Sequence, residues 1–82
     1  MVQWRFNELL ERCRAQSGEP VLLSHIAAET GLALSTVYWL AARPPQRIAL
    51  HTVDVLLGFF ARRMGPLTTD DLIRFEAPVV SE

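Results

Sequence analysis

The side chains best suited to chemical recognition lie together between residues 34 and 43. Ser35 and Thr36 carry hydroxyl groups that can hydrogen-bond the edges of nucleic-acid bases, and Arg43 can donate to guanine or to a phosphate. Two apolar side chains, Leu34 and Ala42, can contact the methyl groups of thymine. Two aromatic side chains, Tyr38 and Trp39, can contact sugars or phosphates.

A pair of short helices is predicted to position these side chains. The stretch 22–43 reads LLSHIAAETGLALSTVYWLAAR, and its apolar spacing predicts one helix over about 22–30 and a second over about 34–42. Gly31 follows the first helix, where glycine adopts the left-handed conformation without strain. Pro44 ends the second helix. This is the helix-turn-helix plan, in which the second helix enters the major groove of DNA.

Three further helices are expected to hold this pair. They span about 4–15, about 50–64, and a short segment that begins at Thr68 and is closed by Pro78. The apolar residues on their inner faces are Phe6, Leu9, Leu10, Cys13, Val53, Leu56, Leu57, Phe60, Met64, Leu72 and Phe75, with Leu40, Leu56 and Phe60 at the centre of the core. The predicted fold class is therefore all-α, with five helices in one domain over residues 1–82 and a short tail over 76–82.

This order of elements resembles the Xre/Cro-like family of bacterial and phage repressors. The resemblance covers nearly the whole chain and rests on four segments: WRFNELLERC at 4–13, AAETGLALSTV at 27–37, RIALHTVDVLLGFF at 47–60 and TTDDLIRFEAP at 68–78. It implies a five-helix lambda-repressor-like domain that binds double-stranded DNA sequence-specifically as a transcriptional regulator, mostly as a repressor.

Two positions beside the predicted recognition helix are assigned partly through this resemblance. In the family the loop after the recognition helix lies along the DNA backbone, so Arg47 resembles a phosphate clamp; the alternative is a solvated surface arginine. Ser24 and His25 stand at the start of the preceding helix, whose N-terminus favours an anion. The alternative for His25 is an ordinary surface histidine.

The outer face of the predicted recognition helix departs from the family pattern. The family usually has Arg, Gln, Ser or Asn there, whereas this chain has Leu34, Tyr38 and Trp39. Three interpretations follow: the face reads DNA, it binds a protein partner, or Trp39 partly packs under the following loop. A protein-interaction module, such as an antitoxin or a repressor antagonist with little DNA affinity, is therefore the alternative function. The helix also has Ala33 where the family often has a polar residue.

Several apolar residues remain after the inner faces are filled. They are Val55, Phe59, Ile73, Val79 and Val80, which we expect at a homodimer interface away from the recognition helix. The competing explanation is that the fifth helix folds over Val55 and Phe59. The short apolar start at Val2 and Trp4 is also expected to pair with Val79 and Val80 as a small ribbon.

Composition sets limits on the other function classes. The 82 residues carry a net charge of −1, but residues 66–82 hold a balance of −3, which leaves +2 on residues 1–65. His25, His51 and Cys13 have no metal-ligand spacing, and no glycine-rich phosphate loop or paired nucleophile and base is present. We therefore expect neither an enzyme nor a cofactor or metal, no membrane partner, and a location in the reducing cytoplasm.

Overall fold

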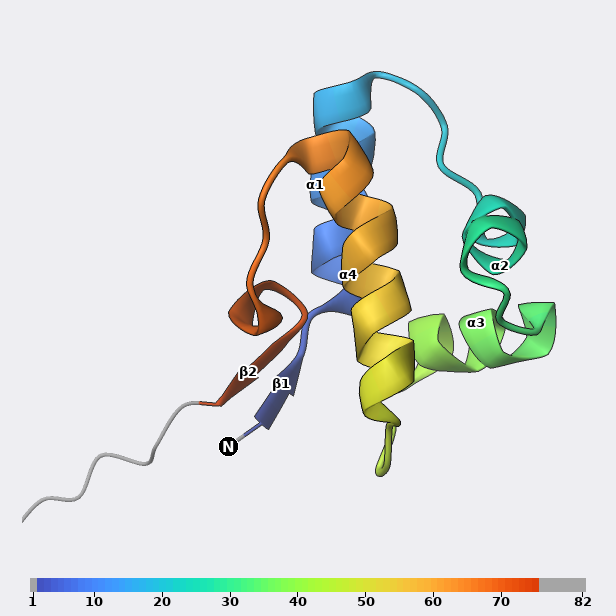
Figure 1. The fold of residues 1–82 in the computed structure, drawn as a ribbon, viewed down its shortest axis with the longest axis vertical. Coiled ribbons are helices and arrows are strands. Elements are labelled where there is room, and N and C mark those ends of the chain that lie inside the picture. Colours follow the sequence, from blue (N-terminus) through green and yellow to red (C-terminus); the bar gives the residue numbers. More distant parts are fainter. Residues whose placement is uncertain (1, 76–82) are drawn as a thin grey trace, which may run out of the picture.

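The computed structural model describes residues 2–75, which form a mostly helical domain with a small strand pair (Figure 1). The elements in chain order are β1 (Val2–Trp4), α1 (Phe6–Ser17), α2 (Leu23–Thr30), α3 (Leu34–Ala42), α4 (Leu50–Met64), the 3-10 turn η1 (Thr69–Asp71) and β2 (Ile73–Phe75). None of the helices in this part of the chain is both long and apolar enough to cross a membrane.

The helix-turn-helix pair forms where the sequence predicts it. The bounds of α3 and α4 match the prediction, and α2 begins one residue later than expected. Gly31 ends α2 in the left-handed conformation with φ of 77°, and its N–H donates to the carbonyl of Ala27. The turn from α2 to α3 therefore depends on a backbone conformation that glycine adopts at the least cost.

One continuous core lies between α1, α2, α3, α4 and the segment after η1. Its buried members are Phe6, Leu9, Leu10, Cys13, Val21, Ile26, Val37, Leu40, Val53, Leu56, Phe59, Phe60 and Leu72. The prediction that Leu40, Leu56 and Phe60 are buried is confirmed. Aromatic rings fill its middle, because Phe60 meets both Phe6 and Phe59 edge to face.

The predicted fifth helix is wrong, because the chain makes only one 3-10 turn there. At the start of this turn the Thr68 N–H donates to Oδ2 of Asp71 over 2.8 Å, which is one half of a capping box. After that turn the apolar Ile73 and Phe75 alternate with Arg74, which is the two-residue period of a strand. The open edge of β1 supplies the hydrogen-bonding partner that makes the strand favourable.

The two strands form an antiparallel ribbon. Val2 pairs with Phe75, Gln3 with Arg74 and Trp4 with Ile73. The N-terminal half of the ribbon was predicted at Val2 and Trp4, and α1 begins at Phe6 rather than Trp4 for this reason. The predicted partners Val79 and Val80 lie outside the described residues.

Phe59 is not available to a second subunit, which corrects its expected place in a dimer interface. It is 2% exposed. The Arg63 guanidinium lies 4.0 Å above its ring and also pairs with Glu29 of α2. Side chains of α2 and α4 within one chain therefore cover this ring. Val55 and Ile73 are only partly buried.

Candidate nucleic-acid interface

The outer face of α3 is open to solvent over its whole length. Val37 and Leu40 turn inward and are buried. All seven predicted contacts on the helix and at its end, Leu34, Ser35, Thr36, Tyr38, Trp39, Ala42 and Arg43, are exposed. Trp39 is 59% exposed, so it packs only in part under the following loop, through the Arg43 guanidinium that lies over its ring. α3 lies at one side of the molecule, and the ribbon extends on the other side (Figure 1).

The side chain of Trp39 packs against that of Arg43. The Arg43 guanidinium lies 4.6 Å from the centre of the indole ring, which is a cation–π contact. Tyr38, Trp39, Ala42 and Arg43 together line a shallow, mostly apolar hollow on the surface. A flat aromatic surface beside a guanidinium group can pack on a sugar and donate hydrogen bonds to a neighbouring phosphate.

Two side chains from the start of the chain fix the C-terminal end of α3. Nε1 of Trp4 donates to the carbonyl of Leu40 over 2.8 Å, and Nδ2 of Asn7 donates to the carbonyl of Ala41 over 2.8 Å. The last carbonyls of a helix have no partner within the helix, so these bonds satisfy two of them. They tie α3 to β1 and α1. The sequence alone does not predict this pair of hydrogen bonds, and its only signal is that Trp4 lies off the inner face of the predicted first helix.

The N-terminus of α2 places Ser24 and His25 at the surface, as predicted. Nδ1 of His25 accepts a hydrogen bond from the Leu22 N–H over 3.4 Å, a long bond that makes the imidazole a local cap of α2. The remaining side of the ring faces solvent. Leu23, the first residue of α2, packs against the core.

Charge is distributed unevenly between this surface and the rest of the described chain. No carboxylate occurs between Glu29 and Asp54, a stretch that includes all of α3 and the loop after it. Elsewhere, arginines pair with acids: Arg5 with Glu8, Arg12 with Asp71, Arg14 with Glu11 and Arg63 with Glu29.

Arg43 and Arg47 are exposed and have no ion-pair partner among residues 2–75. Positive charge is therefore left uncompensated on the α3 surface despite the net charge of −1. The gap in acidic residues was visible in the sequence and was missed.

The loop between α3 and α4 adjoins the ribbon. The loop residues Pro44, Pro45, Gln46 and Ile48 line a hollow together with Val2, Trp4 and Ile73 of the ribbon. Ile73 is partly buried because it also packs against the core. Arg47 stays exposed within the same loop, so its guanidinium remains able to contact a ligand that lies along α3.

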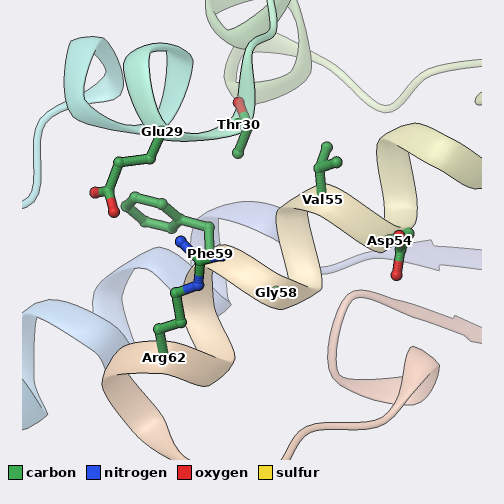
Figure 2. Close-up of a pocket in the computed structure, with 7 residues that line it drawn as sticks. All are labelled: Glu29, Thr30, Asp54, Val55, Gly58, Phe59 and Arg62. Atoms are coloured by element: carbon green, nitrogen blue, oxygen red, sulfur yellow. The ribbon is translucent and has the colours of Figure 1, made fainter.

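A second hollow lies between α2 and α4, away from the residues predicted to bind DNA. Figure 2 shows its lining residues, Glu29, Thr30, Asp54, Val55, Gly58, Phe59 and Arg62. Val55, predicted at a dimer interface, lies at this hollow. The lining offers no nucleophile with an adjacent base, and no group of three metal-ligating side chains occurs among the described residues.

Comparisons with protein-family models, with curated proteins and with solved structures returned no match to this chain. The resemblance to the Xre/Cro-like repressors therefore stays a prediction from the sequence, and the function is inferred from the surface of α3 itself.

Proposed function

We propose that this protein is a sequence-specific binder of double-stranded DNA that inserts α3 into the major groove and acts as a transcriptional regulator. The observation that carries the proposal is the open outer face of α3, which lies in a stretch without carboxylates and is flanked by the unpaired Arg43 and Arg47. Hydroxyl groups of Ser35 and Thr36 supply hydrogen bonds to base edges. The N-terminus of α2, with Ser24 and His25, supplies a phosphate contact.

A homodimer would give this small surface the affinity that a single helix lacks. Two copies about a twofold axis would present two α3 helices about 34 Å apart, one turn of DNA, and would read a pseudo-palindrome. The regulator would then occupy a promoter and act as a repressor, as the resemblance implies.

The test is selection of bound sequences from random duplex DNA at moderate salt, followed by titration of the best duplex. We expect the logarithm of the affinity to fall with the logarithm of salt concentration with a slope on the order of −3 to −6 per dimer, because few cationic side chains are available. Arg47→Ala should weaken binding to all sequences alike, whereas Ser35→Ala should change the preferred sequence.

Arg12→Ala is the matched control for Arg47→Ala. It also removes one positive charge, but from an ion pair with Asp71 at η1 and not from the α3 surface. We expect its DNA affinity to stay close to that of the unmodified protein. If no sequence is enriched, and binding does not respond to salt, the proposal is wrong.

A second candidate function is a protein-interaction module that uses the same face. Leu34, Tyr38 and Trp39 are 42%, 54% and 59% exposed, and large apolar groups of this kind are enriched in the centres of protein interfaces. Failure of the DNA selection, together with capture of a protein partner by the unmodified chain and not by Trp39→Ala, would favour this candidate.

A further inference from the structure

One row of residues on the exposed side of α4 has no role within the single chain. Asp54, Gly58 and Arg62 are spaced four residues apart, so they lie along one face of the helix. All three are exposed. Figure 2 shows Asp54 and Arg62 on either side of Gly58 along α4, beside the hollow that α4 forms with α2.

Gly58 is not explained by the fold of one copy. Glycine is the least favourable helix-interior residue after proline, yet it stands near the middle of a 15-residue helix. A Cβ atom at this position would meet nothing within 4 Å. What glycine does provide is a bare stretch of backbone, which another helix can approach closely.

The two charged residues of the row are also without partners. No hydrogen bond or ion pair links Asp54 or Arg62 to another described residue, whereas the neighbouring Arg63 pairs with Glu29. Eight residues of helix separate Asp54 from Arg62 by about 12 Å along the axis. They therefore cannot pair with each other in the same copy.

The row is complementary to itself when it is reversed. Rows of residues four apart are the ridges that interlock in the commonest class of helix packing. If two α4 helices cross antiparallel with their Gly58 residues at the crossing point, Asp54 of each copy lies beside Arg62 of the other. A twofold axis generates both ion pairs at once. The partly exposed Val55 adds apolar surface beside the crossing.

We propose that the exposed row Asp54–Gly58–Arg62 of α4 is the surface through which two copies of this chain pair, antiparallel about a twofold axis at Gly58. The proposal rests on the homodimer of the proposed function and names its interface. The occupant is a second copy because the charges on the row match those of the same row when it is inverted. The outer face of α3 takes no part in this contact and stays open.

Charge reversal tests the pairing directly. Asp54→Arg leaves two arginines on the row, and Arg62→Asp leaves two aspartates. Each variant alone turns two attractive pairs into two repulsive ones, so we expect the dimer dissociation constant in sedimentation velocity at low salt to rise about tenfold or more. The double variant Asp54→Arg with Arg62→Asp restores opposite charges and should dimerise like the unmodified protein.

Mixing the two single variants gives the sharpest result. In a 1:1 mixture, each arginine of one variant faces an aspartate of the other, so two chains that are monomeric alone should form a heterodimer. Glu19→Arg is the matched control for Asp54→Arg, because it makes the same charge change at an exposed position away from α4. It should sediment as the unmodified protein does.

Gly58 gives a second measurement that does not depend on charge. Gly58→Ala should raise the melting temperature measured at a concentration where the chain is monomeric, because alanine favours the helix and meets no atom. The larger Gly58→Leu should remain folded but weaken dimerisation about tenfold or more by separating the two helices. Retained folding is read from circular dichroism.

The outcomes separate this inference from DNA binding. A dimer that tolerates both single reversals and Gly58→Leu, failure of the mixed variants to associate, or a chain that is monomeric at high concentration overturns the interface. Each result leaves the DNA selection with α3 variants as an independent measurement. Conversely, a dimer that follows the charge pattern but enriches no DNA sequence supports the interface and overturns the proposed function.

Discussion

Replacing Trp4 by phenylalanine should weaken both the fold and the placement of α3. The indole N–H donates to the Leu40 carbonyl over 2.8 Å in a partly buried position. Phenylalanine keeps an aromatic ring that can stack on Phe6, whose ring centre lies 6.0 Å from that of Trp4. The substitution therefore removes mainly the hydrogen bond.

The expected loss of stability depends on whether the Leu40 carbonyl finds another hydrogen-bond donor in the variant. A neutral hydrogen bond contributes about 0.5–1.5 kcal/mol, and a buried acceptor left without a donor costs about 1–3 kcal/mol. Because the site is only partly buried, water can reach the Leu40 carbonyl, and we expect a loss of about 1–2 kcal/mol in the free energy of unfolding. For a domain of this size each kcal/mol lowers the melting temperature by about 4–8 °C.

Urea denaturation followed by far-UV circular dichroism measures this loss. Benzothienylalanine at position 4 is the matched control, because it keeps the shape of the indole and lacks only the N–H. It should lose nearly as much stability as Trp4→Phe. Asn7→Ala, which removes the donor to the exposed Ala41 carbonyl, should lose less. If the free energies of unfolding of Trp4→Phe and of the control both lie within about 0.3 kcal/mol of the value for the unmodified protein, the anchoring of α3 by Trp4 is refuted.

Two further predictions concern the core and the turn after α4. Phe60→Ala removes a fully buried ring that contacts Phe6 and Phe59 and should cost about 3–5 kcal/mol in urea denaturation, a large share of the stability of so small a domain; a variant that melts within a few degrees of the unmodified protein would contradict the packing. A hydrogen bond from the Thr68 N–H, and then the Arg12 guanidinium, lower the pKa of the Asp71 carboxyl in the folded state. The ionised carboxylate therefore stabilises the fold at pH values above its ordinary pKa of about 3.9. This stabilisation is lost as the pH falls through the lower pKa of the folded state. Denaturation between about pH 6 and pH 2 should therefore show a steeper acid loss for the unmodified protein than for Asp71→Asn, and parallel curves would count against this role.

The helices could be predicted where local signals agree with one another. Gly31, the two prolines after Arg43 and the apolar spacing of α4 all mark the same boundaries that the structure has. The chain after Gly65 could not be predicted in this way. Leu72 and Phe75 are three residues apart, as on a helix, but Ile73 and Phe75 also alternate as in a strand. The choice depends on β1, which lies at the other end of the sequence.

The sequence predicts which residues of the candidate site are exposed, but it does not predict the contacts that hold α3 in place. Helical spacing places Leu34, Ser35, Tyr38 and Trp39 outward once Val37 and Leu40 are assigned to the core. It does not reveal the Trp4 bond, because that contact joins residues 36 positions apart. Phe59 was placed at an interface because helical periodicity does not show that Arg63 covers its ring.

The antiparallel pairing of β1 with β2 has a consequence for the order in which the chain acquires its structure during synthesis. Val2 leaves the ribosome well before its partner Phe75 has been made. We expect the buried face of α1 to stay uncovered until α4 has been made, and β1 to pair later still. Pairing β1 with β2 closes a loop that contains the helices α1 to α4, and this closure is favourable only after the helices have packed and brought the two strands together. Ribbon closure would then be the last step of folding, and a nascent chain that stops after α4 would contain the helices without it.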